Sequence, residues 1–187
     1  MFINGKRREH KMITILTDEK TQKISLAVYN SFARTRGDVR FICLENMTVK
    51  PCYACRGCEQ KTYLRCIVRD DADLILPYLA QSSVRIVVTW ITYGSYSFQT
   101  KRALDKIGLL CDMHYYCKNG ELVKGLNQAG TAFYAVGVHD GAEKSEIQAF
   151  EQLVTENLTI TGWKGKPFTT MAIGFDPSRL LKEVSEL

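Results

Sequence analysis

Residues 12–44 read MITILTDEKTQKISLAVYNSFARTRGDVRFICL. The run MITILT (12–17) is apolar and β-branched, which indicates a short buried strand, and VRFICL (39–44) indicates a second strand. Between them, apolar residues recur at helical spacing over residues 21–36, and Gly37 follows as a helix stop. A strand, a helix and a strand within about 33 residues have the length of a βαβ unit. Such a unit crosses over right-handed and makes its two strands parallel.

The same alternation continues along the rest of the chain. Further strands are expected at residues 84–89, 131–138 and 168–175, and further helices at 73–81, 98–110, 143–158 and 177–184. Pro77 should leave the helix at 73–81 short or distorted. Residues 111–130 are irregular, with a turn at Asn119 and Gly120, and form either a short hairpin or a dimer element. Five strands alternating with helices predict an α/β doubly wound, five-stranded parallel sheet with helices on both faces.

Ligands of such sheets bind outside the carboxyl ends of the strands, at the point where the strand order reverses. Three loops are therefore expected to form the binding edge. They follow the first, third and fourth strands and cover residues 17–23, 89–97 and 137–141.

A cysteine-rich loop separates the second strand from the second helix. It reads KPCYACRGCEQKTYLRCIVRDD (50–71) and places cysteines at 52, 55, 58 and 66 with the spacing C-x2-C-x2-C-x7-C. The triplet Cys52, Cys55, Cys58 resembles the run that holds three corners of a [4Fe–4S] cluster in bacterial ferredoxins, and Cys66 would complete a single-cluster site. Zinc is the competing interpretation, although four-thiolate zinc sites usually present two separated C-x2-C pairs. A loop without metal is the third interpretation. Asp70 and Asp71, which end the loop, are expected to cap the helix that follows.

Composition narrows the class of protein. The chain has 187 residues, 45% apolar and 24% charged, and a formal net charge of +5. We expect a basic leader at residues 1–11 and a single domain at 12–187. The sequence shows no apolar run of the roughly 20 residues needed to span a bilayer, no secretory segment and no nucleic-acid-binding motif. A cytoplasmic location is therefore expected, where an odd count of seven cysteines indicates metal or redox chemistry more than disulfides.

Three segments together resemble a known group of proteins. These are the cysteine loop, WITYGSYSFQTKRALDK (90–106) and YAVGVHDGA (134–142). They are similar to the flavodoxin-like NAD(P)H-dependent FMN reductases, most closely to the iron–sulfur flavoprotein branch. In the second segment the family pattern is matched at Gly94, Ser95, Ser97, Gln99, Lys101 and Asp105. Trp90 and Thr92 stand where the family has proline and tyrosine.

The resemblance implies a flavin site on the three loops. FMN would rest its phosphate on the first loop and its ring against the other two. The residues so implied are Thr17, Lys20, Thr21, Trp90, Thr92, Tyr93, Gly94, Ser95, Gly137, Asp140 and Gly141. The implied function is an oxidoreductase that passes electrons between a reduced donor, NAD(P)H or a small carrier, and an acceptor through FMN and a [4Fe–4S] cluster. A homodimer or homotetramer is also implied. No catalytic residue is assigned, because hydride transfer to flavin needs no protein base.

The first loop departs from the family pattern. Flavodoxin-like loops read roughly T-T-G-N-T, whereas this chain reads Thr17-Asp18-Glu19-Lys20-Thr21. Glu19 stands at the glycine position, and both carboxylates would repel a phosphate. The alternative is therefore a degenerate flavodoxin-fold binding protein without FMN, in which the cysteine loop binds zinc or senses redox state.

Overall fold

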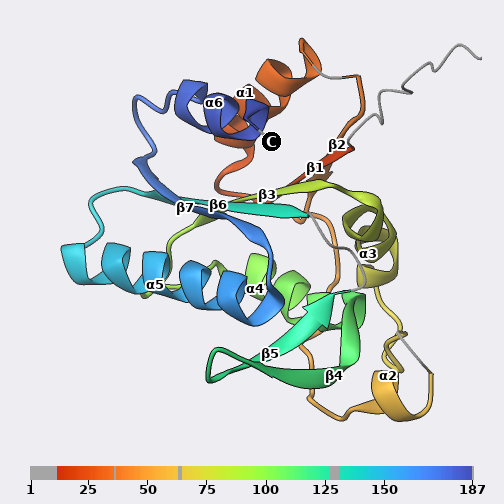
Figure 1. Ribbon diagram of the computed structural model, residues 1–187. Coiled ribbons are helices and arrows are strands. Elements are labelled where there is room, and N and C mark those ends of the chain that lie inside the picture. The colour runs from red at the N-terminus through yellow and green to blue at the C-terminus, as the bar shows by residue number, and fades with distance from the viewer. Residues whose placement is uncertain (1–11, 36, 63–64, 127–130, 187) are drawn as a thin grey trace, which may run out of the picture.

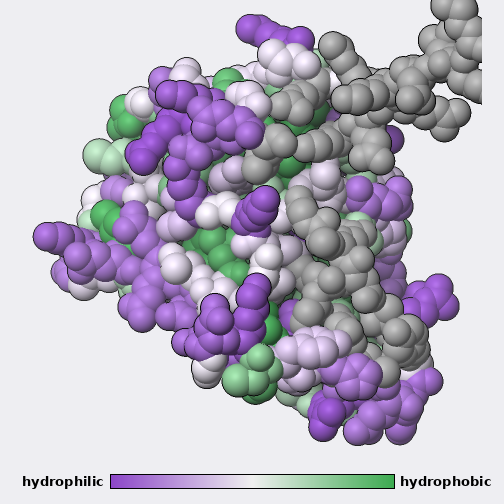
Figure 2. Space-filling view, in the orientation of Figure 1, coloured by the Kyte–Doolittle hydropathy of each residue, from purple (hydrophilic) through white to green (hydrophobic). Residues whose placement is uncertain are grey.

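The computed structural model describes residues 12–35, 37–62, 65–126 and 131–186. The basic leader expected at residues 1–11 lies outside this part of the chain. Among the helices of the described residues, none combines the length and the apolar character that a membrane crossing requires. In Figure 2 purple hydrophilic residues are prominent on the visible face, and green residues form small separate patches at its left edge, near its middle and toward its bottom.

A five-stranded parallel sheet forms the centre of the molecule, in the order β2-β1-β3-β6-β7. Its strands are β1 Ile13–Thr17, β2 Val39–Cys43, β3 Val84–Trp90, β6 Ala132–His139 and β7 Lys164–Met171. The strand order reverses direction between β1 and β3, as in doubly wound sheets of the flavodoxin type. The predicted fold class is therefore confirmed, and the reversal brings the ends of β1 and β3 side by side.

Helices cover both faces of the sheet (Figure 1). They are α1 Gln22–Ala33, α2 Gly57–Gln60, α3 Ala72–Gln81, α4 Phe98–Asp105, α5 Lys144–Thr161 and α6 Ser178–Ser185, with a 3-10 turn η1 at Ile107–Leu110. Helices α1 and α6 lie on one face, and α3, α4 and α5 lie on the other (Figure 1). Successive strand side chains point to opposite faces, so Ile15 packs with α1 and α6 while Leu16 packs with α3 and α5.

Two elements differ most from expectation in their boundaries, and Pro77 does not cut short the helix expected at 73–81. The fifth strand, expected at residues 168–175, is β7 and begins four residues earlier. The helix expected at 98–110 ends at Asp105 and continues as the 3-10 turn η1. Helix α3 runs for ten residues with Pro77 inside it.

The irregular stretch 111–130 contains an antiparallel hairpin, which confirms the first of its two interpretations. Strands β4 Cys111–Lys118 and β5 Glu121–Leu126 are joined through Asn119 and Gly120, which have φ of 55° and 82°. Positive φ at both central residues is typical of the type I′ turn that Asn-Gly favours. The hairpin lies below α4, on the side away from the sheet and beside the cysteine loop with α2 (Figure 1).

Candidate functional site

The four cysteines of the loop line one cavity of about 570 Å3. The loop supplies one wall, and the opposite wall comes from η1 and the hairpin through Gly108, Leu109, Tyr115 and Lys124. Cys52 and Cys55 are exposed, Cys58 and Cys66 are half-buried, and all four are free thiols. The structure thus brings together in one hollow the four residues predicted from spacing to be ligands.

The backbone of this loop is held in an uncommon conformation. Ala54 and Arg56, on either side of Cys55, have φ of 51° and 54°, in the left-handed region that side chains with a Cβ rarely adopt. Each such residue costs on the order of 1–3 kcal/mol, and residues of this kind cluster at functional sites. Residues that alternate between right- and left-handed conformations turn successive N–H groups toward one concavity, a geometry found at phosphate and iron–sulfur sites.

The four cysteine side chains do not converge on one point in this structure. Across the described ranges, no three His, Cys, Asp or Glu side chains stand close enough together to hold a metal ion. Burial raises the pKa of the Cys58 thiol, and the neighbouring Glu59, Cys52 and Cys66 act in the same direction. Because metals bind thiolates, cysteines in this setting release protons as they bind a metal. The exposed stretch 51–56 leaves room for the side chains to converge.

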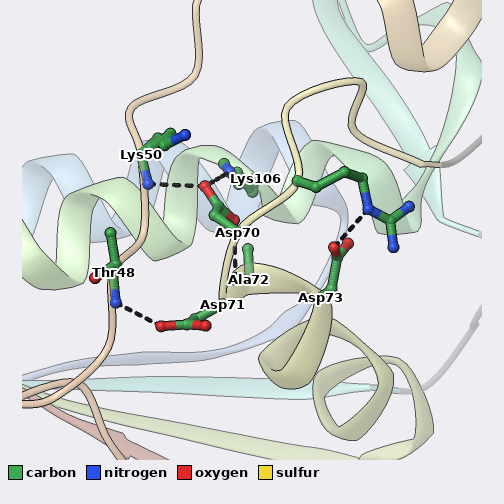
Figure 3. Close-up of polar contacts among 8 residues, drawn as sticks. Thr48, Lys50, Asp70, Asp71, Ala72, Asp73 and Lys106 are labelled. Atoms are coloured by element: carbon green, nitrogen blue, oxygen red, sulfur yellow. Dashed lines mark hydrogen bonds and ion pairs between the residues drawn. The ribbon is translucent and has the colours of Figure 1, made fainter.

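Two carboxylates close the cysteine loop at its base (Figure 3). Asp71 Oδ2 accepts a hydrogen bond from the Thr48 backbone N–H at 2.6 Å, and Asp70 Oδ2 accepts one from the Lys50 N–H at 2.8 Å. The residues that follow the loop therefore bind the residues that precede it. The predicted capping of α3 is met in part: Asp70 Oδ1 accepts from the Ala72 N–H at 3.0 Å, whereas Asp71, the N-cap residue, makes no side-chain capping hydrogen bond.

A buried ion pair between Asp70 and Lys106 links the base of the cysteine loop to the end of α4. Lys106 Nζ, just after α4, binds Asp70 Oδ2, and the two side chains are 2% and 3% exposed. Burial acts to raise the pKa of Asp70, but the hydrogen bonds from Lys106, Lys50 and Ala72 outweigh it and hold that pKa below its usual value. No local sequence pattern predicts the role of Lys106, because its partner Asp70 is 36 residues away in the chain.

The first loop is organised around Asp18, which is 2% exposed. Asp18 Oδ1 accepts hydrogen bonds from the Thr21 backbone N–H at 3.0 Å and the Thr21 hydroxyl at 2.9 Å. Its Oδ2 accepts from the Trp90 N–H at 2.8 Å and the Thr89 hydroxyl at 3.0 Å. A carboxylate of the chain thus sits at the N-terminus of α1 and at the end of β3.

The hydrogen bonds of Asp18 determine whether the first loop can hold the phosphate of FMN. A phosphate loop works by offering free N–H groups and a helix N-terminus to the anion. Here the Asp18 carboxylate already uses the Thr21 N–H, and a second anion at that place would be repelled. The first loop therefore does not fit a cofactor phosphate, although Thr17 and Thr21 both lie at this point, with their hydroxyls 2.9 Å apart.

The other residues implied for the flavin lie on the loops after β3 and β6. Trp90 is half-buried, with Lys20 Nζ 5.3 Å from its ring centre, and Tyr93 has φ of 50° and a side chain that is 93% exposed. Backbone hydrogen bonds between Thr92 and Ser95, at 3.0 Å in both directions, close a tight turn around Tyr93.

Close packing explains why two positions of these loops are glycine. A Cβ on Gly94 would lie 2.7 Å from Ala149 of α5, and one on Gly137 would lie 2.6 Å from the Phe150 ring. Both glycines let α5 pack closely. Asp140 is exposed, and Gly141 has φ of 81° in open space. Their assignment to a flavin site stays a prediction.

Comparison with solved structures identifies the architecture. A Streptococcus mutans protein matches with a TM-score of 0.65 at 13% identity, covering 94% of this chain and 96% of that one. An FMN-dependent NADH-azoreductase from Bacillus anthracis, solved in complex with FMN, matches with a TM-score of 0.60 at 14% identity over 94% of this chain and 96% of that one. The fold is flavodoxin-like.

A third match is an NADH:FMN oxidoreductase in its apo form, with a TM-score of 0.59 at 12% identity over 94% of this chain and 88% of that one. No protein-family model matches the sequence, and no curated protein matches it at a significant level. At these identities the likeness extends to the fold. The chemistry of the site has to be argued from its own residues.

Proposed function

We propose that this chain is an electron-transfer oxidoreductase whose redox centre is a [4Fe–4S] cluster held by Cys52, Cys55, Cys58 and Cys66. The observation that carries the proposal is that all four cysteines line one cavity. Their spacing matches a single-cluster loop, and the backbone on both sides of Cys55 is left-handed, a conformation used in the anion-binding concavities of iron–sulfur sites. Such a cluster, when bound, accepts and releases single electrons.

The surrounding residues have separate tasks in this proposal. Lys124 extends from the hairpin into the cavity wall, and its Nζ lies 2.9 Å from Glu59 Oε1, while Arg56 Nε lies 2.8 Å from Glu59 Oε2. With Glu59 counted, this group carries one net positive charge beside the cysteines, which would offset part of the negative charge of a thiolate-bound cluster. The Asp70–Lys106 pair holds the base of the loop, so that the thiols are presented from a fixed frame.

Metal content tests the proposal directly. Protein purified without oxygen is expected to contain about four irons per chain, with broad absorption near 400 nm from thiolate–iron charge transfer. Cys55→Ser should remove most of the iron, because a serine hydroxyl is a poor ligand for a cluster of this kind. Cys117→Ser is the matched control, since this exposed cysteine lies on β4 outside the cavity, and it should leave the iron content unchanged. Equal iron in the Cys55 variant, or no iron in the parent protein, would reject the proposal.

The second candidate function is a flavodoxin-fold binding protein without FMN, whose cysteines bind zinc or sense redox state. The observation that favours it is the Asp18 carboxylate at the N-terminus of α1. The same metal assay separates the two candidates. About one zinc per chain in a colourless protein supports the second, because a structural zinc site takes four thiolates around one ion.

Flavin binding rests on the shared fold. The solved relatives named above include one that binds FMN and one that is named for acting on it. On that ground FMN is the second proposed cofactor and NAD(P)H the proposed donor, with the ring between the β3 and β6 loops. Assembly as a homodimer or homotetramer and a cytoplasmic location remain predictions that go with this family resemblance.

Because Asp18 fills the phosphate place, FMN is expected to bind this chain no more tightly than riboflavin, which lacks the phosphate. Equilibrium dialysis with fluorescence detection of each flavin measures the two affinities side by side. Glu19→Gly is the control, because Glu19 is exposed and its removal leaves Asp18 in place, so the ratio should stay near one. A preference for FMN of tenfold or more would mean that the phosphate has another site on this chain.

A further inference from the structure

A second cavity, of about 260 Å3, lies between α4 with η1 on one side and α5 on the other. Its walls are largely apolar, from Leu104, Ile107, Phe133, Leu153 and Ile160. An apolar cavity of about 150 Å3 is enough to bind benzene, so the space suits a substituted single ring. The walls set the size and the apolar character of a ligand, and the polar groups among them set its chemistry.

Two of the residues that line this cavity, Trp163 and Tyr96, carry side-chain hydrogen-bond donors. Trp163 is 8% exposed, and its Nε1–H has no hydrogen-bond partner among the described residues. A buried donor without a partner is costly, and native structures usually supply an acceptor for it. The Trp163 ring is held in place, because it stacks on Phe133 with ring centres 5.4 Å apart and the Arg85 guanidinium lies 4.5 Å from its centre.

Tyr96 supplies the second donor. Its hydroxyl oxygen accepts a hydrogen bond from Asn157 Nδ2 at 3.2 Å, which leaves the phenolic proton to donate. Burial raises the pKa of Tyr96 to about 12, so that proton is retained at neutral pH. The cavity therefore has an apolar body and two donors, while its charged lining residues Lys101, Asp105 and Lys124 are held in ion pairs. A ligand that complements the two donors carries an acceptor.

The cavity also adjoins the cysteine cavity. Asp105, Gly108 and Lys124 line both. A molecule bound between α4 and α5 would lie next to the four thiols, separated from them by these three residues.

We propose that this cavity binds a small aromatic carbonyl compound, with its ring among the apolar side chains and its carbonyl oxygen accepting a hydrogen bond from Trp163 Nε1. The Tyr96 hydroxyl donates to the same oxygen or to a second one. The binding does not depend on any metal at the cysteines, so its outcome is separate from that of the iron assay.

Acetophenone and ethylbenzene are the matched probes, because they have nearly the same size and differ in the carbonyl oxygen. Isothermal titration of the protein as purified is expected to show acetophenone binding at least fivefold more tightly, the effect of about one net hydrogen bond. Trp163→Phe keeps an aromatic ring and removes the donor, so it should lower acetophenone affinity at least fivefold and leave ethylbenzene affinity nearly unchanged. Tyr29→Phe removes a donor hydroxyl on α1, at the opposite face of the sheet, and should change neither.

Three results would overturn the inference. They are equal affinity for the two probes, unchanged acetophenone affinity in Trp163→Phe, and no binding of acetophenone at all. Leu153→Trp guards against binding elsewhere on the surface, because the larger side chain fills the cavity and should abolish binding of both probes. Circular dichroism confirms that each variant is folded before it is titrated.

Discussion

Lys106→Met is expected to lower the free energy of unfolding by about 3–5 kcal/mol, the usual cost of removing one partner of a buried ion pair. The methionine keeps most of the side chain's length, but Asp70 then remains buried without its cation. Urea denaturation measures the loss as a shift in the transition midpoint. Because Asp70 also binds the backbone ahead of the cysteine loop, limited proteolysis of the variant should cut first within residues 50–70.

The matched control for this change is Lys101→Met. Lys101 pairs with Asp105 on the surface of α4, and the two side chains are 45% and 36% exposed. Exposed pairs contribute about 0–1 kcal/mol, so this variant should unfold almost as the parent does. If Lys106→Met were no more destabilising than Lys101→Met, the buried pair would not be what fastens the loop.

The pH dependence of the same pair has a definite sign. The folded protein holds the pKa of Asp70 below its usual value, so its charged form stabilises the fold above the unfolded pKa of about 3.9. That contribution is lost as pH falls through the folded pKa. The difference in stability between the parent and Lys106→Met should therefore be largest near neutral pH and shrink as the pH falls below about 4.

Gly165→Ala is expected to destabilise the protein by more than about 3 kcal/mol, or to prevent it from accumulating in soluble form. Gly165 lies in β7 with φ of 132°, and a Cβ there would stand 1.8 Å from the backbone oxygen of Phe133 in β6. The clash is with backbone, so β6 and β7 would have to separate. Thermal unfolding of purified protein, together with soluble yield, measures the effect.

Gly174→Ala isolates the contribution of backbone conformation alone. Gly174 has φ of 83°, but nothing lies within 4 Å of the Cβ position. Left-handed backbone costs an alanine roughly 1–2 kcal/mol, so this variant should remain folded with a modest loss. Similar losses at the two positions would contradict the steric argument for Gly165.

The centre of the sheet could be predicted because β1, β3 and β6 are buried and are therefore nearly continuous runs of apolar and β-branched residues. Strand β3 is the clearest case, with VRIVVT predicted and Val84–Trp90 observed. Strand β7 was misplaced because it begins with KGKPF, in which Gly165 and Pro167 both oppose a strand assignment. Proline is tolerated there because β7 is at the edge of the sheet.

The candidate site was predictable where its signal is local. The cysteines are close in sequence, so their spacing predicted them as one set of ligands, and the structure places all four on one cavity. The Asp70–Lys106 pair and the hydrogen bonds of Asp18 to Thr89 and Trp90 join residues far apart in the chain, and only the folded arrangement reveals them. The sequence predicts that the carboxylates of the first loop repel phosphate. It does not predict that Asp18 links the start of α1 to the end of β3 through hydrogen bonds.

The hydrogen bonds of Asp18 have a consequence for how the domain folds. In a cofactor-dependent domain of this fold, the N-terminus of α1 would be completed by an anion supplied from outside, and the apoprotein would lack that support. Here the chain carries its own anion, and Asp18 joins β1, α1 and β3 through hydrogen bonds made entirely within the polypeptide. The nascent domain is therefore expected to fold without an external anion at this loop. Under the proposed function, metal loading of the cysteine loop would be a later, separate step.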